Sequence, residues 1–203
     1  MKLAGIRVVI MCKAPVKGRV KTRLMTALSA EHATAVHAAM ATTVIERTKR
    51  LFDDVVLAAD DIKHPFFTSF GLPVLSQHEG NLGDRMHRQV SQAFEQDTQA
   101  VLLLGTDSPH MPDARLLDAA AGLQSHDVVL GSVEDGGYDL IAMNAAHPVF
   151  DAVDWSTPQV LPQTLNHIRR LQLTSKLLDV SFDVDLPSDI ERARTAGWQY
   201  AGL

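Results

Sequence analysis

The chain alternates between short, mainly apolar runs and longer stretches whose apolar residues recur at helical spacing. Apolar runs lie at Gly5–Met11, Asp54–Ala59, Ala100–Gly105 and Asp127–Leu130. Runs of this kind are typical of strands that are buried on both faces of a sheet. Two later stretches, GGYDLIAMN and Leu177–Phe182, indicate further strands, and the first of them is either a plain strand or an arm of a hairpin. The pattern therefore predicts a sheet that is covered on both sides.

Helical patterns fill the segments between these strands. Ser29 is a good N-cap for a long helix that runs to about Leu51, because its hydroxyl can accept a hydrogen bond from a free N–H of the first turn. Further helices are predicted over Leu82–Gln96, from Pro112 to Gly122, from about Pro158 and from about Pro187. This alternation predicts an α/β fold with a mainly parallel sheet and helices on both faces. No linker or repeat interrupts it, so residues 1–203 are expected to form one domain.

Composition and charge narrow the class of protein. A hydrophobic share of 46% and a charged share of 21% are those of an ordinary globular protein. The net charge of −5 argues against a nucleic-acid partner, which would require basic charge spread over a face. The first apolar run is short and contains Arg7, so neither a membrane span nor a signal peptide is predicted. The single cysteine, Cys12, cannot form an internal disulfide, and a cytoplasmic protein is expected.

The segments that follow the predicted strands carry most of the charged candidates. In an open α/β sheet, ligands bind beyond the carboxyl ends of the strands. The segment after the first strand, CKAPVKGRVKTRL, is strongly basic, whereas TDSPHMP, EDGGY and DVDLPSD follow later strands and are acidic. We therefore expect one cationic loop and three acidic loops to converge on one edge of the sheet.

The basic loop suits a phosphate ligand. Lysine offers a mobile point charge, arginine a bidentate fork, and the backbone around Gly18 can approach a ligand closely. Any one of these cations taken alone is equally consistent with a solvated surface charge, but five together favour a di- or triphosphate. The five are Lys13, Lys17, Arg19, Lys21 and Arg23. A P-loop does not fit, because Lys13 stands where its first glycine is required and Arg19 follows Gly18.

Asp107 follows an entirely apolar strand. A carboxylate in that position is costly unless it is paired or bound to a cation. It either caps a turn or binds Mg²⁺ or Mn²⁺ together with substrate phosphates. Asp183 and Asp185 offer two more carboxylates, and one of them is expected to share the ion with Asp107. Asp189 is expected to stabilise the N-terminus of the final helix.

The EDGGY loop supplies candidates for substrate recognition. Asp135 and Tyr138 could bind the hydroxyls and the face of a sugar-like substrate. Gly136 and Gly137 would let this loop approach the substrate, although a glycine pair alone equally predicts a hairpin turn. The stretch therefore leaves both readings open.

A second glycine-containing loop, QHEGNLGDRM, precedes a predicted helix. Gly83 and Arg85 either close over a base or ribose or simply form the helix entry. Other chemistries lack their motifs, because the nine histidines show no HExxH spacing, one cysteine cannot build a zinc site, and no G-x-S-x-G elbow occurs. The chemistry is therefore expected to rest on a cation, the substrate and its positioning.

Six stretches together resemble a known family. KAPVKGRVKTRL, QHEGNLGDRM, LLLGTDSPHMP, EDGGYDLIAM, WSTPQVLPQT and DVDLPSD, in this order, resemble small bacterial proteins of GT-A fold that are nucleotide-diphospho-sugar transferase-like or glycosyltransferase-like. More remotely, they resemble the nucleotidyltransferases that make molybdopterin derivatives. The resemblance covers nearly the whole chain and implies a Rossmann-like three-layer sandwich with a mainly parallel mixed sheet.

The resemblance also implies ligands and roles. The ligands would be a nucleoside di- or triphosphate or a nucleotide sugar, a small-molecule acceptor, and Mg²⁺ or Mn²⁺. Asp107 would bind the cation together with Asp185 or Asp183, and Asp107 and Lys21 would carry the chemistry. The phosphates would lie along Lys13, Arg19, Lys21 and Arg23.

The sequence departs from the family pattern at three places, and the last of them leaves the reaction open. Leu186 stands where a threonine is frequent, and Ala142 stands where a glycine is usual. Glycosyltransferases of this fold often carry Asp-x-Asp at the central strand, whereas Asp107 stands alone here. We expect a cation-dependent transferase that uses a nucleotide-activated sugar. The alternatives are a nucleotidyltransferase that releases pyrophosphate and a non-catalytic nucleotide-binding module.

Overall fold

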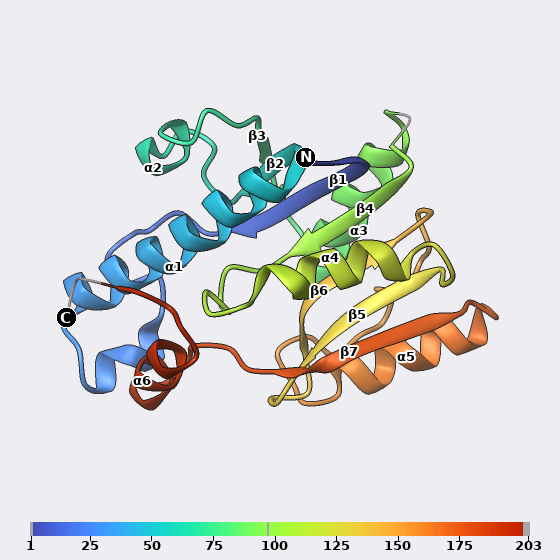
Figure 1. Cartoon of the computed structure of the whole chain (residues 1–203). Helices are drawn as coiled ribbons and strands as arrows, with labels where there is room; N and C mark the ends of the chain where they lie inside the picture. Colours follow the sequence, from blue (N-terminus) through green and yellow to red (C-terminus); the bar gives the residue numbers. More distant parts are fainter. Residues whose placement is uncertain (1, 97, 201–203) are drawn as a thin grey trace.

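A seven-stranded sheet forms the middle layer of the molecule (Figure 1). The computed structural model describes residues 2–96 and 98–200. The strands are β1 (Leu3–Cys12), β2 (Phe52–Ala59), β3 (Val74–Ser76), β4 (Ala100–Leu104), β5 (Val128–Val133), β6 (Tyr138–Met143) and β7 (Ser175–Ser181). Their order is β3-β2-β1-β4-β6-β5-β7, in which β6 runs antiparallel to β4 and β5 and the other pairs are parallel. The predicted mainly parallel mixed sheet is confirmed.

Helices cover both faces of this sheet (Figure 1). α1 (Ala30–Leu51), the short α2 (Pro65–Thr68) and α4 (Asp113–Gly122) lie on one face, and α3 (Leu82–Phe94) and α5 (Val160–Arg170) on the other. α6 (Pro187–Thr195) and the 3-10 helix η1 (Thr22–Thr26) pack against the first half of α1. This confirms the expected Rossmann-like three-layer sandwich. Within the described residues, none of the helices has the length and apolar character that a membrane span requires.

The two-sided cover explains the apolar runs of the sequence. Val8 and Ile10 of β1 belong to the core under α1 and α4, whereas Val9 between them belongs to the core under α3 and α5. Successive side chains of a strand point to opposite faces, so every position of a strand between two helical layers must be apolar.

Side-chain caps set two helix starts where the sequence predicts them. The Ser29 hydroxyl accepts a hydrogen bond from the His32 N–H at 3.2 Å, and α1 begins at the next residue. The Asp189 carboxylate accepts from the N–H groups of Asp185 at 3.1 Å and Leu186 at 2.7 Å, directly before α6. Both predicted N-terminal interactions are confirmed.

Some boundaries differ from the predicted ones. β7 begins at Ser175 rather than Leu177, and α5 begins at Val160 rather than near Pro158. Three short elements, η1, α2 and β3, lie in segments for which the sequence predicts no element. Each has five residues or fewer, which is too short for a hydrophobic period to show.

Candidate functional site

The expected edge of the sheet carries a pocket of about 720 Å³. This volume is in the range of small-molecule sites, roughly 300–1,000 Å³. Loops that follow β1, β4, β5 and β7 form its polar walls. The predicted site residues that line it are Lys13, Lys21, Arg23, Arg85, Asp107, Asp135, Gly137, Tyr138, Asp183 and Asp185. The basic loop and the three acidic loops therefore do converge.

Lys21 stands at the centre of the polar wall. Its Nζ lies 2.8 Å from Oδ1 of Asp107 and 2.8 Å from Oδ1 of Asp185, and its side chain is only 6% exposed. Burial acts to lower the pKa of Lys21, but the two carboxylates outweigh it and the pKa is raised. A protonated lysine thus joins the loop after β1 to those after β4 and β7.

The backbone of Lys21 is strained. Its φ of 45° and ψ of 45° place it in the left-handed region, which residues with a Cβ rarely adopt. Such conformations cost on the order of 1–3 kcal/mol and cluster at functional sites. Here the kink ends the basic loop and begins η1, so the strain falls on the residue that contacts both carboxylates.

Asp107 is fixed by its backbone as well as by its side chain. Its carbonyl accepts a hydrogen bond from the Val184 N–H at 2.8 Å, which joins the loop after β4 to the segment after β7. Its carboxylate contacts the Lys21 ammonium rather than a backbone N–H of its own turn. Burial acts to raise the pKa of Asp107, but the Lys21 charge outweighs this and the pKa is lowered. The side chain is therefore ionised at neutral pH.

Asp183 and Asp185 occupy different surroundings. The Asp183 carboxylate accepts a hydrogen bond from Ser108 Oγ at 2.7 Å, and burial, with Asp107 nearby, raises its pKa to about 7. Asp185 instead contacts Lys21, and its Oδ2 lies 3.1 Å from Nη1 of Arg23. Asp185, and not Asp183, thus faces the same ammonium as Asp107.

The two carboxylates on Lys21 fit a hard divalent cation. Oxygens of Asp107 and Asp185 converge on one point, and Mg²⁺ typically takes one or two carboxylates plus substrate phosphates and water. In the part of the chain that the structure describes, no group of three or more His, Cys, Asp or Glu side chains could enclose a metal. A cation held here would therefore take its remaining ligands from substrate and water.

Part of the basic loop lies outside the pocket. The ammonium of Lys17 pairs with the carboxylate of Glu31 at the surface. Arg19 is exposed, and neither it nor Gly18 is among the pocket residues. Gly18 has a φ of 79°, so its role in the loop is conformational. Of the five cations, the pocket wall takes Lys13, Lys21 and Arg23.

Sequence reasoning missed two polar residues that support the pocket. Asp60 follows β2 and accepts a 2.6 Å hydrogen bond from a backbone N–H of the basic loop. The buried Gln77 donates to backbone carbonyls of β1 and β2 and accepts from Arg85 Nη1 at 3.1 Å. The position of Asp60 directly after an apolar run, like that of Asp107, is the signal that could have found it.

The EDGGY stretch forms the turn of the β5–β6 hairpin. Gly136 has a φ of 89°, and a Cβ there would lie 2.7 Å from Cα of Pro158. The Tyr138 hydroxyl is buried next to Thr164 of α5, and burial raises its pKa. Only the ring of Tyr138 is thus available to a ligand, whereas Asp135 and Gly137 line the open pocket.

Close packing against neighbouring residues explains why residue 83 is a glycine. A Cβ at this position would lie 2.7 Å from Trp155 Nε1 and 2.8 Å from the Phe150 carbonyl oxygen. The glycine therefore lets the indole of Trp155 lie against α3. Trp155 lines the pocket, although the sequence singled it out only as part of the WSTPQVLPQT stretch.

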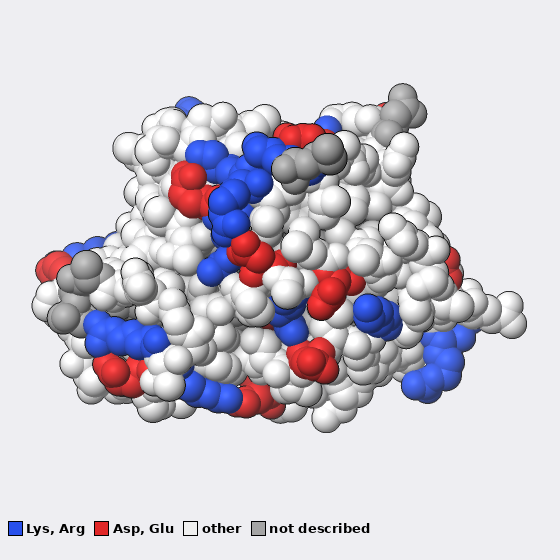
Figure 2. Space-filling view, viewed as in Figure 1, with Lys and Arg blue, Asp and Glu red and all other residues white. Residues whose placement is uncertain are grey.

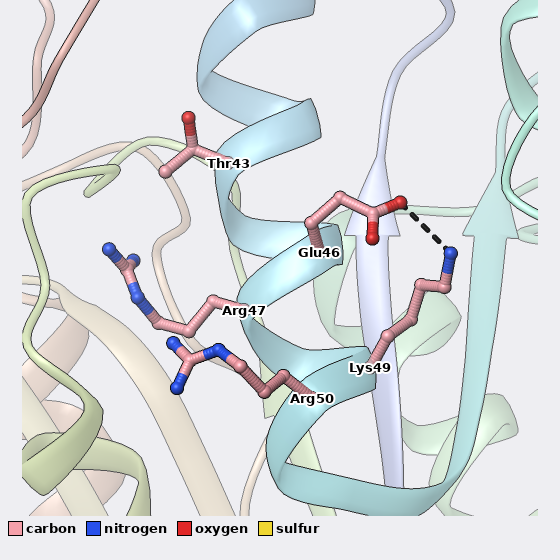
Figure 3. Close-up of a pocket in the computed structure, with 5 residues that line it drawn as sticks. All are labelled: Thr43, Glu46, Arg47, Lys49 and Arg50. Carbon is pink, nitrogen blue, oxygen red and sulfur yellow. Dashed lines mark hydrogen bonds and ion pairs between the residues drawn. The ribbon is translucent and has the colours of Figure 1, made fainter.

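A second hollow, of about 600 Å³, lies on the outer surface of α1 (Figure 3). Thr43, Glu46, Arg47, Lys49 and Arg50 line it. Figure 2 shows basic side chains gathered over the second half of α1, with acidic side chains beside them. These charges are paired, Lys49 with Glu46 and both arginines with Asp113 of α4. We assign no function to this surface.

Solved structures share this fold. A candidate nucleotide-diphospho-sugar transferase from Desulfovibrio desulfuricans G20 superposes with a TM-score of 0.84 at 27% identity, over 91% of this chain and 84% of that chain. CMP:2-keto-3-deoxy-manno-octonic acid synthetase complexed with CTP gives a TM-score of 0.61 at 13% identity, over 94% and 97%. Glucosyl-3-phosphoglycerate synthase from Mycobacterium tuberculosis, in complex with Mn²⁺, UDP and glucosyl-3-phosphoglycerate, gives 0.58 at 12% identity, over 94% and 76%.

These likenesses define the class of fold, that of the nucleotide-diphospho-sugar transferases, and confirm the resemblance seen in the sequence. At their low identities, the last two relatives show the shared fold alone. Residues 41–157 match the model of a family described as an uncharacterized protein conserved in bacteria (DUF2064). The match spans more than half of the chain, so the protein belongs to this family. Among curated proteins, none matches the sequence.

Proposed function

We propose that the protein is a divalent-cation-dependent transferase that uses a nucleotide-activated sugar. The observation that carries the proposal is the convergence of Asp107 and Asp185 on Lys21 beside a pocket of about 720 Å³. The naming of the D. desulfuricans structure as a candidate nucleotide-diphospho-sugar transferase supports the same class.

The basic wall would bind the diphosphate. Lys13 and Arg23 belong to the loop after β1 and line the pocket, and Lys21 of the same loop contacts both carboxylates. Negative charge grows on the diphosphate as it leaves, so cations fixed in advance stabilise the transition state more than the ground state. In this proposal Lys21 exchanges its carboxylate contacts for a phosphate oxygen when the donor binds.

Asp107 and Asp185 would hold Mg²⁺ or Mn²⁺. When bound, such an ion neutralises charge on the leaving diphosphate. Asp183 has a different role in this proposal. Its hydrogen bond from Ser108 Oγ ties the loop after β4 to the segment after β7, so it positions Asp107 rather than contacting the ion.

A second candidate function is nucleotidyl transfer, in which a substrate phosphate attacks the α-phosphorus of a nucleoside triphosphate and pyrophosphate leaves. One observation favours it. Asp107 stands alone at the end of β4, and the next residue, Ser108, uses its hydroxyl on Asp183 instead of offering a second carboxylate to an ion.

Product analysis separates the two reactions. The protein would be incubated with Mg²⁺, a panel of nucleotide sugars or nucleoside triphosphates, and a mixture of hydroxyl and phosphate acceptors. We expect Mg²⁺-dependent release of nucleoside diphosphate from one nucleotide sugar, and no release by the Asp107→Asn variant. Pyrophosphate release from a triphosphate would establish the second candidate. Nucleotide binding without either product would indicate a non-catalytic module.

A further inference from the structure

Two aromatic residues, Trp155 and Tyr138, form an aromatic wall of the pocket. Trp155 lines the pocket, and its ring meets that of Tyr138 edge-on, with centroids 6.5 Å apart and planes at 85°. Phe150 packs behind, with its ring centroid 6.3 Å from that of Trp155. The indole also lies against Gly83, where a side chain would collide with it. Trp155 is thus held by packing on several sides, is partly buried and lines the pocket.

The loop that carries Trp155 is strained and cross-linked. Ala152 and Ser156, on either side of it, have φ values of 51° and 64°, which non-glycine residues rarely adopt. The Asp154 N–H donates to Gln163 Oε1 at 2.7 Å, and Gln163 Nε2 donates to Asp154 Oδ2 at 2.7 Å. Strain of this kind persists only where the surroundings fix the conformation, and it clusters at ligand sites. The loop therefore holds the indole in one orientation before any ligand binds.

A carboxylate belongs to the same rigid unit. Gly136 packs against Pro158, and its carbonyl accepts a hydrogen bond from the Leu161 N–H at 2.9 Å, so the hairpin turn is joined to the start of α5. In that turn, Asp135 Oδ1 accepts from the Gly137 N–H at 2.9 Å. This leaves Oδ2 of Asp135 as the oxygen that can accept from a ligand.

The order of the strands in the sheet indicates which part of a bound ligand would contact Trp155 and Tyr138. The basic loop follows β1, Asp107 follows β4, and Tyr138 begins β6, and these strands are consecutive neighbours in the sheet. A diphosphate that spans the cations and the carboxylates lies across the ends of β1 and β4. The group attached to its terminal phosphate then reaches the wall of Trp155 and Tyr138.

We propose that Trp155 is a specificity-determining residue that stacks on the ring of the sugar carried by the donor, while Asp135 accepts a hydrogen bond from a hydroxyl of that sugar. This inference rests on the proposed glycosyl-transfer function. A sugar ring offers an apolar C–H face and a rim of hydroxyls, and the wall offers a flat apolar surface beside a carboxylate. The indole would therefore contact the C–H face of the sugar, and the carboxylate would bind one of its hydroxyls.

Binding measurements with two matched ligands test this. Calorimetry in Mg²⁺ would compare a nucleoside diphosphate with the nucleotide sugar of the same base, both chosen from the product screen. We expect Trp155→Ala to lower the affinity for the nucleotide sugar by about tenfold and to leave that for the diphosphate unchanged. Trp155→Phe, which keeps a flat ring, should lose less.

The chain offers a matched control in its other tryptophan. Trp198 is 3% exposed, stacks on Tyr200 and donates to Thr43 Oγ1, remote from the pocket. Trp198→Phe should bind both ligands as the wild type does, and it leaves Trp155 as the single indole of the chain. In this variant the nucleotide sugar should change the tryptophan emission more than the diphosphate does. This readout keeps the test valid even if Trp155→Ala does not fold.

Two results would overturn the inference and leave the proposed function standing. Equal losses of affinity for both ligands in Trp155→Ala and Trp155→Phe would place the indole at the base or the phosphates. Unchanged affinity for the nucleotide sugar, with no difference in emission between the ligands, would remove Trp155 from the site. Failure of the wild type to bind either ligand would contradict the proposed function itself.

Discussion

At the scale of single residues, Lys21 explains why an acidic chain gathers cations in its first loop. Its side chain is buried, and its ammonium lies 2.8 Å from each of two carboxylates, which belong to other loops. Without it, Asp107 and Asp185 would face each other, which disfavours ionisation of both. We therefore regard Lys21 as an internal cation that stabilises the site until a nucleotide and a divalent ion bind.

Replacing this internal cation should expose its role. We expect Lys21→Met to lower the free energy of unfolding by about 1–3 kcal/mol, because two carboxylates lose a buried charged partner. Mn²⁺ alone, without nucleotide, should restore much of that loss, since the ion can take the place of the ammonium. Denaturant unfolding with and without Mn²⁺ measures both effects.

Lys17→Met is the matched control for this variant. Lys17 and Glu31 form an ion pair in which both side chains are mostly exposed, and solvent screens exposed pairs, so they contribute little to stability. An equal loss of stability in the two variants, or a Lys21→Met protein that does not respond to Mn²⁺, would contradict the role given to Lys21.

At the scale of elements, a buried ion pair between Arg115 and Asp139 joins α4 to the β5–β6 hairpin. Arg115 donates from Nε to Asp139 Oδ2 at 2.9 Å and from Nη2 to Asp139 Oδ1 at 3.0 Å. Its Nη2 also donates to the Ser132 carbonyl of β5 at 3.1 Å. Gly131 leaves room for this pair, because a Cβ there would lie 2.8 Å from Arg115 Nη2 and closer still to the Asp139 carboxylate.

Adding one methyl group to β5 should therefore disrupt the pair. We expect Gly131→Ala to destabilise the protein by about 1–3 kcal/mol, the usual cost of overpacking a core. Gly105→Ala is the control, because its Cβ would come no closer than 3.5 Å to a neighbouring heavy atom, Asp139 O. Urea unfolding of both variants measures the difference. Equal midpoints for the two would show that the ion pair can shift without loss of stability.

The sequence predicts best the strands that are buried on both faces and the helix that begins at a capping residue. β4 and residues 8–12 of β1 lie between two helical layers, so every position there is apolar, and α1 starts at a capping serine. β3 has three partly buried residues, and η1 depends on the left-handed backbone of Lys21, so neither leaves a periodic pattern. Tertiary contacts, not local preference, define these short elements.

The sequence indicates many of the residues that line the pocket, but it does not indicate which of them contact one another. The charges after the strands predicted that these side chains meet at one edge of the sheet, because the carboxyl ends of parallel strands lie there, and ten of the predicted residues do line one pocket. The contact between Lys21 and Asp185 joins residues 164 positions apart in the chain. Trp155 likewise reaches the pocket through a strained loop that lies over Gly83. Contacts of this range follow only from the folded structure.

At the scale of the whole molecule, side chains of both charges are concentrated at one pocket. A chain with a net charge of −5 presents three cations on one wall of a pocket and a converging pair of carboxylates beside them. Anionic phosphates and a divalent ion are the ligands that satisfy both groups at once. The claim is that nucleotide binding depends on a cation held by Asp107 and Asp185.

Thermal unfolding with a panel of nucleoside di- and triphosphates, with and without Mg²⁺, tests this claim most directly. A ligand at 100 times its Kd adds roughly 2.7 kcal/mol of stability, and each kcal/mol raises the Tm of a chain of this size by roughly 2–4 °C. We expect Mg²⁺ to enlarge the shift in the wild type and in Asp183→Asn, which can keep a hydrogen bond with Ser108. Asp107→Asn should fold and lose the Mg²⁺-dependent part of the shift. If Asp107→Asn keeps the full Mg²⁺-dependent shift, Asp107 does not hold the cation and the central claim is wrong.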